Sequence, residues 1–197
     1  MSDLKFDPKT HTYYNDGQAV ISVTQVLKPI SKKIYENIPK HRLDVAAKRG
    51  TAIHYAIELY SEFGVKDIDK EFEGYLDGYI KFAKDFNHKA LKNEYMVYSK
   101  LGYAGTLDNL GEVNNELCLV DYKNVAKVHS GLVGLQLSAY RQGLKEEGIE
   151  VNKAGCLQLK PNGKHKFIIY TKEQLDEYFE HFKMLLNTRK LIKFYSN

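Results

Sequence analysis

Residues 105–140 read GTLDNLGEVNNELCLVDYKNVAKVHSGLVGLQLSAY, and the rest of the chain is interpreted around them. Two segments rich in apolar and β-branched residues, 103–113 and 116–124, flank Asn114-Asn115. Because asparagine tolerates the left-handed backbone of tight turns, these residues predict a β-hairpin with a two-residue loop. In that register Asp108 faces Asp121 on the partner strand, with the Cβ atoms roughly 4.5 to 5.5 Å apart.

Two aspartates and a lysine are expected to converge on one face of this hairpin. Side chains alternate between the faces of a strand, so Asp121 and Lys123 share a face and Tyr122 points the other way. Carboxylates as close as Asp108 and Asp121 repel each other unless they share a proton or hold a cation. The apolar run from Leu117 to Val120 is typical of a central, covered strand. The alternative is a structural ion cluster or a solvated strand end.

Four motifs in this chain together resemble those of the PD-(D/E)XK nuclease superfamily, and within it the RecB-like exonucleases, including phage-encoded ones. They occur in the order RGTAIH (Arg49–His54), GTLD (Gly105–Asp108), LVDYKN (Leu119–Asn124) and QLSAY (Gln136–Tyr140). Two features depart from the pattern: no Pro precedes Asp108, and Asn124 stands where that subgroup frequently has Thr. The resemblance implies an α/β fold with a restriction-endonuclease-like αβββαβ core, in which a mixed β-sheet is flanked by helices.

The resemblance also implies a metal site. RecB-like nucleases take a metal-ligating histidine from a helix that precedes the sheet, and His54 is the match. With Asp108, Asp121 and the carbonyl of Tyr122, it is expected to hold one or two Mg²⁺ or Mn²⁺ ions. Lys123 is expected to position or deprotonate the attacking water and to offset the charge of the phosphorane.

The resemblance to RecB-like nucleases also implies supporting roles for three further residues. Glu94 corresponds to an acidic residue that many RecB-like relatives carry on the first strand, where it assists the site or braces it. Gln136 and Tyr140 match the QxxxY motif and share one helix face, so they are expected to orient Lys123 or to contact DNA. The alternative for this pair is packing alone. The other histidines match no motif and are treated as lying outside the site: His11, His41, His88, His129, His165 and His181.

Length and composition predict one domain. The 197 residues are assigned to a single nuclease domain, 1–197, with 1–40 as an N-terminal hairpin and helix and 41–197 as the catalytic core. A net charge of +4 is compatible with a polyanionic partner without demanding one. No apolar run approaches the ~20 residues that a membrane span needs, and the start lacks a signal-peptide core, so a cytoplasmic protein without membrane contact is expected.

The two cysteines, Cys118 and Cys156, are expected to be small core residues in a reducing compartment. Some RecB-like relatives carry an iron–sulfur cluster on four cysteines. No such cluster is expected here, because this chain has too few cysteines to hold one in that way.

The remaining elements are predicted from periodicity and turn residues. A hairpin around Asn15-Asp16-Gly17 precedes a helix that is capped by Ser22 or Thr24. Helices are predicted for 41–63, 67–87, 131–147 and from a capping box at Thr171 onward, and strands for 94–100, 154–160 and 165–170. Four lysines mark either a solvated helix face or a patch for the phosphate backbone: Lys81, Lys84, Lys89 and Lys92.

The motifs favour a metal-dependent DNA exonuclease of recombination or DNA-end processing. The expected partner is DNA with a free end; a recombination or single-strand-binding protein and a second copy of the chain are further candidates. One alternative is a structure-selective or nicking endonuclease on the same fold. Another is a non-catalytic DNA-binding or assembly module, against which the complete set His54, Asp108, Asp121 and Lys123 argues, because decayed members of the family typically lose one of these residues.

Overall fold

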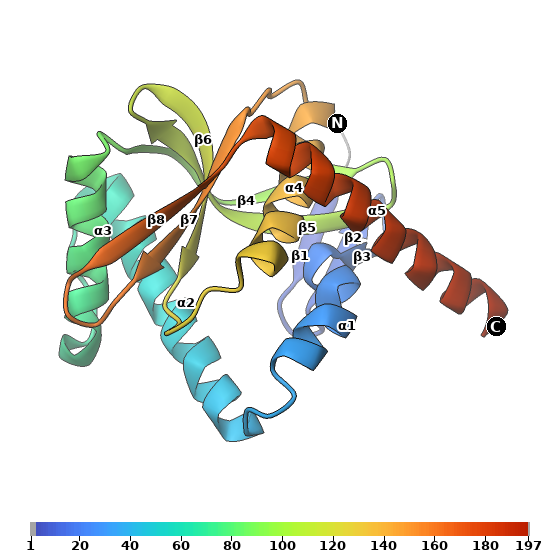
Figure 1. Ribbon diagram of the computed structural model, residues 1–197, viewed down its shortest axis with the longest axis horizontal. Helices are drawn as coiled ribbons and strands as arrows, with labels where there is room; N and C mark the ends of the chain where they lie inside the picture. The colour runs from blue at the N-terminus through green and yellow to red at the C-terminus, as the bar shows by residue number, and fades with distance from the viewer. Residues whose placement is uncertain (1–2, 197) are drawn as a thin grey trace.

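The structure, a computed structural model, describes residues 3–196 and places helices on both faces of a mixed sheet (Figure 1). The strands are β1 (Leu4–Asp7), β2 (Thr12–Asn15), β3 (Gln18–Ser22), β4 (Lys89–Ser99), β5 (Tyr103–Val113), β6 (Glu116–Lys123), β7 (Lys153–Leu159) and β8 (His165–Tyr170). The helices are α1 (Val23–Ile34), α2 (Lys40–Phe63), α3 (Glu73–Asp85), α4 (Ser130–Glu146) and α5 (Lys172–Tyr195), and a 3₁₀ turn spans Lys70–Phe72. Within residues 3–196, no helix is both long and apolar enough to cross a membrane.

The sheet confirms the predicted fold class. Its strands follow the order β1-β2-β3-β5-β6-β7-β8, and β4 pairs with the other edge of β5. The hairpin register is as predicted, because Asn109 pairs with Val120 and Val113 with Glu116. Asn114 and Asn115 have φ angles of 52° and 65°, the two positive values that a type I′ turn requires. Helix α4 then supplies the crossover from β6 to the parallel strand β7, which completes the αβββαβ order.

Strand β5 changes its neighbour along one edge. Strand β3 pairs with Tyr103 and Ala104, whereas β6 pairs from Asn109 onward. Residues 105–108, the GTLD motif, therefore lie at a fork between β3 and β6. The side chain of Asp108 reaches across this fork, where its Oδ2 accepts a hydrogen bond of 2.7 Å from the backbone N–H of Tyr122. The fork opens the sheet at the predicted site.

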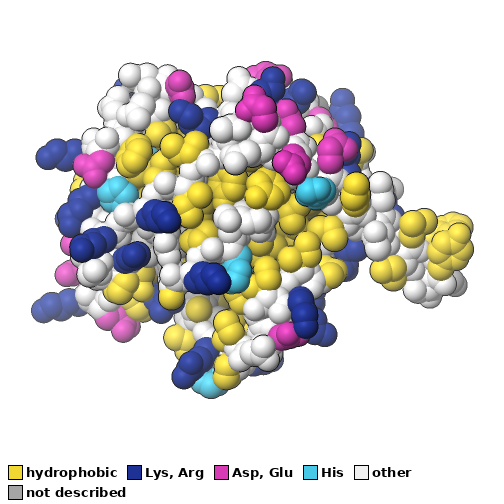
Figure 2. Space-filling view, in the orientation of Figure 1, with side chains coloured by type: hydrophobic (Ala, Val, Ile, Leu, Met, Phe, Trp, Pro, Cys, Tyr) yellow, Lys and Arg dark blue, Asp and Glu magenta, His cyan; other side chains and the backbone are white. Residues whose placement is uncertain are grey.

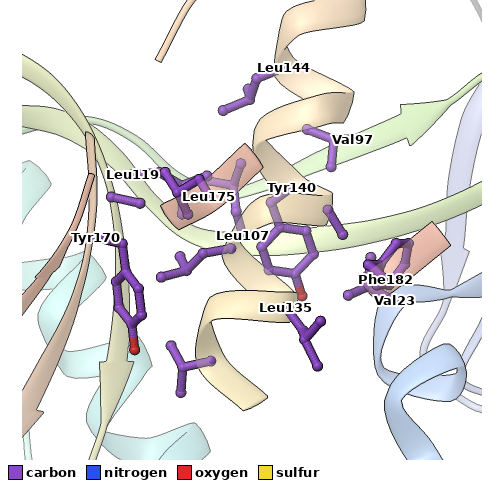
Figure 3. Close-up of a cluster of buried hydrophobic side chains, with 14 of the residues drawn as sticks. Val23, Val97, Leu107, Leu119, Leu135, Tyr140, Leu144, Tyr170, Leu175 and Phe182 are labelled. Atoms are coloured by element: carbon purple, nitrogen blue, oxygen red, sulfur yellow. The ribbon is translucent and has the colours of Figure 1, made fainter. Parts of the chain in front are cut away.

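Each face of the sheet has its own apolar core. Helices α1, α4 and α5 contribute to one cluster, which includes Leu107, Leu119 and Phe182 (Figure 3). Helices α2 and α3 contribute to the other, together with residues of β6 and β7. Cys118 and Cys156 are buried, free thiols, as expected, and burial raises the pKa of each to about 12. They are therefore protonated core residues at neutral pH.

The prediction for residues 80–100 was partly wrong. Strand β4 begins at Lys89, well before the predicted strand at 94–100, and the helix of the 67–87 region is confined to α3 and the preceding 3₁₀ turn. Lys89 and Lys92 thus lie on a strand, so the four lysines do not form one helix face. The physical reason is that β4 pairs only with β5 and therefore lies at an edge of the sheet. An edge strand tolerates charged residues, and these hide the alternation of apolar and polar residues that marks a strand.

His88 makes stability depend on pH. The residue is 8% exposed, its Nε2 lies 3.1 Å from Asn109 Oδ1, and its buried Nδ1 has no hydrogen-bond partner. Burial lowers the pKa of His88 from 6.5 to about 4. Because the unfolded chain then binds this proton more tightly than the folded one, the contribution of His88 is complete above pH ~6.5 and is lost as the pH falls toward ~4, by about 3 kcal/mol.

The measurement is urea unfolding at pH 7 and at about pH 4.5, for the wild type and for His88→Gln. Carboxylates also titrate in this window, so the comparison between the two proteins isolates the histidine. The wild type is expected to lose more stability on acidification than the variant. Equal losses would show that the pKa of His88 in the folded protein stays near 6.5, as for a histidine in contact with solvent.

Candidate metal centre

Three side chains from three elements converge at the fork in the sheet. They are His54 on α2, Glu94 on β4 and Asp108 on β5, and one ligand atom from each lies within 4.8 Å of the others. His54 Nδ1 is 3.7 Å from Glu94 Oε1 and 3.7 Å from Asp108 Oδ1. Two ligands that each lie about 2.1 Å from one ion are about 3 to 4 Å apart, so the spacing fits a shared divalent cation.

The backbone of β6 orients His54. Its Nε2 lies 3.2 Å from the carbonyl oxygen of Tyr122, and since that oxygen can only accept, Nε2 donates. Nδ1 then faces the carboxylates, as in metal-ligating histidines whose second ring N–H is held by a backbone carbonyl. Burial lowers the pKa of His54, but Asp108 and Glu94 outweigh this effect and raise it from 6.5 to about 9. The surroundings of Nδ1 therefore favour a cation.

Glu94 owes its position to an unusual backbone. Its φ is 44°, and the other non-glycine residues with positive φ in residues 3–196 lie in turns rather than in a strand. Strand β4 pairs with β5 on both sides of Glu94, through Asn93 and Tyr95, so the deviation is local. Strain of this kind costs about 1–3 kcal/mol and clusters at functional sites. It supports Glu94 as a ligand, whereas the sequence left its role between assisting and bracing.

Asp121 and Lys123 form a buried ion pair beside this cluster. Lys123 Nζ lies 2.7 Å from Asp121 Oδ1 and 2.6 Å from Oδ2, and the aspartate side chain is 2% exposed. Only Oδ1 meets hydrogen-bond geometry, so the buried Oδ2 has a lone pair available to a cation. Burial raises the pKa of Asp121 to about 6, opposed by Lys123 and assisted by Asp108. Burial lowers the pKa of Lys123, but the two carboxylates outweigh it, and the ammonium stays charged.

The predicted ligands thus fall into two groups. The structure brings His54 and Asp108 together and adds Glu94, which the sequence had placed in a supporting role. Asp121 lies next to them but is paired with Lys123, and the carbonyl of Tyr122 accepts a hydrogen bond from His54. The ligand roles of Asp121 and Tyr122 stay predictions.

Gln136 and Tyr140 lie where α4 crosses the GTLD segment. Gln136 Nε2 donates to the Tyr140 hydroxyl over 3.1 Å, and Tyr140 is 3% exposed. The Tyr140 ring packs on Gly105, where an added Cβ would approach Cε1 to 2.6 Å. Gln136 lines a small cavity that Lys123 also lines. Tyr140 therefore supports the strand that carries Asp108, while Gln136 faces the site.

This packing predicts that Gly105→Ala destabilises the protein by about 1–3 kcal/mol, because the new methyl group collides with the Tyr140 ring. Denaturant unfolding measures the effect. Gly131→Ala is the matched control, since a Cβ at Gly131 meets no atom within 4 Å. Tyr140→Leu in the Gly105→Ala background is expected to recover part of the loss. An unfolding midpoint for Gly105→Ala equal to that of the wild type would contradict the close contact.

Two polar side chains beside the site were not predicted. Arg49 Nη2 donates to the carbonyl of Asn124 over 3.3 Å and so ties α2 to the residue that follows Lys123. Arg49 Nε and Asn124 Nδ2 are buried and have no hydrogen-bond partner. Both residues stand at the ends of the quoted motifs, but their contact spans distant parts of the chain and leaves no periodic signal.

Comparison with known proteins supports the fold. No protein-family model and no curated protein sequence matches the chain. A candidate exonuclease from Eubacterium rectale has a solved structure that matches with a TM-score of 0.50 at 10% identity, over 73% of this chain and 68% of that chain. The protein SSO0001 matches with a TM-score of 0.43 at 13% identity, over 85% of this chain and 76% of that chain. At 10% identity the first likeness shows a shared mixed α/β fold.

Proposed function

We propose that this protein is a divalent-metal-dependent nuclease that hydrolyses phosphodiester bonds of DNA, as an exonuclease acting on free ends. The observation that carries the proposal is the convergence of His54, Glu94 and Asp108 beside the buried Asp121–Lys123 pair. Two further points support it: the fold shared with the Eubacterium rectale protein, and the resemblance of four motifs to the RecB-like branch of the PD-(D/E)XK superfamily.

Phosphodiester hydrolysis needs a nucleophilic water, neutralised charge on the non-bridging oxygens and a stabilised leaving oxygen. A bound Mg²⁺ or Mn²⁺ supplies Lewis acidity and lowers the pKa of a water molecule. His54, Glu94 and Asp108 would hold the ion, because oxygen ligands suit Mg²⁺ and a histidine among them admits Mn²⁺. Lys123 stays charged at neutral pH, so it orients a water molecule and offsets the negative charge of the phosphate.

The test is the digestion of end-labelled linear DNA beside covalently closed circular DNA, with Mg²⁺, with Mn²⁺ and with chelator. Metal-dependent loss of the linear substrate alone is the expected result. Cleavage of the closed circle would favour the endonuclease alternative, because a circle has no end. Retained DNA binding without cleavage under any condition would favour the non-catalytic module.

A further inference from the structure

Two hollows run along α4 beside the candidate site, and apart from Lys123 and Gln136 their lining residues have no part in the proposed function. The smaller is a cavity of about 30 Å³ between the end of α1 and the loop after β6, where Lys123 and Gln136 contribute to the lining. The larger is a hollow of about 500 Å³ between α1, α4 and α5. The two spaces share Val128, His129 and Leu132 in their linings, so they lie next to each other along α4; together they are called the α4 groove, and Lys123 lines the smaller one.

The lining of this groove combines rings, apolar side chains and positive charge. The rings are Tyr35, His129, Tyr178 and His181, and Tyr35 meets His129 edge to face with centroids 5.7 Å apart. Lys127 and Lys123, the latter paired with Asp121 behind the lining, supply the charge, and the lining residues within the described part of the chain include no Asp or Glu. Figure 2 shows hydrophobic side chains gathered over α1, α4 and α5 on this face, with Lys, Arg and His side chains beside them and Asp and Glu side chains over the start of α5.

We propose that this groove binds unpaired nucleotides of a DNA strand next to the scissile phosphate, so that the preferred substrate is a single-stranded end. The inference rests on the proposed function, because it takes Lys123 as the place where the strand is cut. Aromatic rings stack on the faces of unpaired bases whatever their sequence, and lysines follow the phosphates. A duplex keeps its base faces stacked inside and presents charged backbone, which would leave the apolar walls of the groove without a partner.

The first test compares Tyr35→Ala with Tyr35→Phe. The probe is a fluorescein-labelled oligothymidylate of about 12 nucleotides, with binding followed by fluorescence anisotropy in Ca²⁺. Stacking needs the ring and not the hydroxyl, so Tyr35→Phe is expected to bind as the wild type does and Tyr35→Ala about tenfold more weakly. Equal affinities of the two variants would overturn the proposal.

The second test introduces a negative charge into the groove. Leu132→Asp is expected to weaken oligothymidylate binding about tenfold, whereas Leu191→Asp, at an exposed position outside both linings, is expected to leave it unchanged. Circular dichroism checks that Leu132→Asp folds, and the Tyr35 pair remains decisive if it does not. Two results would overturn the proposal: an equal loss of affinity for a blunt duplex, or a wild-type dimer that Leu132→Asp dissociates without any effect on DNA.

Binding in Ca²⁺ separates this inference from the nuclease assignment. If the wild type cleaves no DNA but the groove variants bind oligothymidylate more weakly than it does, the groove is a binding site for single strands and the nuclease assignment fails. If the wild type degrades DNA but the groove variants bind and cleave single strands as it does, the nuclease assignment stands and the groove proposal fails.

Discussion

Asp121→Asn is expected to lower metal-dependent DNA cleavage by about a thousandfold or more while the protein stays folded. The carboxylate lies beside the His54–Glu94–Asp108 cluster, and its buried Oδ2 lies 2.6 Å from Lys123 Nζ without hydrogen-bond geometry. An amide keeps the volume of the side chain but removes the charge that favours a cation. Lys123 loses its main partner in this variant. Its side chain is 27% exposed and Asp108 remains near, so the ammonium keeps access to solvent and a negative charge beside it.

Initial rates on linear DNA in Mg²⁺ and in Mn²⁺ measure this effect. Asp77→Asn is the matched control: its carboxylate on α3 is 51% exposed and meets Lys66 over 3.5 Å, away from the cluster. The control is expected to cleave at the wild-type rate and the Asp121 variant hardly at all. A wild-type rate of cleavage in Asp121→Asn would show that catalysis does not need the Asp121 carboxylate.

The parts of the site that could be predicted from the sequence depend on local rules. The Asn114-Asn115 turn fixes the register of β5 against β6, and alternation along β6 then places Asp121 and Lys123 on one face. The capping box at Thr171 likewise placed the start of the last helix, and Ser22, one of two predicted caps, is the N-cap of α1. In each case residues within a few positions of one another determine the geometry.

The rest of the site depends on contacts between distant segments. Glu94 joins the cluster through a left-handed backbone inside a strand, which no propensity favours. His54 is oriented by a carbonyl on β6, and Arg49 reaches the end of the same strand. These positions follow from the packing of α2 against the sheet, so a pattern confined to one element could not reveal them.

Lys123→Met is expected to separate metal binding from catalysis. Two groups oppose the carboxylates of this site: the ammonium of Lys123, which pairs with Asp121, and the imidazole of His54, whose pKa Asp108 and Glu94 raise to about 9. Methionine has a similar length and fills the same space, but it removes the positive charge that is paired with Asp121. Mn²⁺ is therefore expected to bind about tenfold more tightly, while cleavage falls by about a thousandfold because the group that orients water and offsets phosphate charge is lost.

Calorimetric titration with Mn²⁺ in the absence of DNA and initial cleavage rates measure the two effects on the same protein. Lys153→Met is the matched control, because Lys153 pairs with Glu116 at the opposite end of β6 and its side chain is 32% exposed, close to the 27% of Lys123. It is expected to change neither quantity. Weaker Mn²⁺ binding in Lys123→Met would mean that the ammonium holds Asp121 in a ligating orientation, whereas unchanged cleavage would show that the water is activated without it.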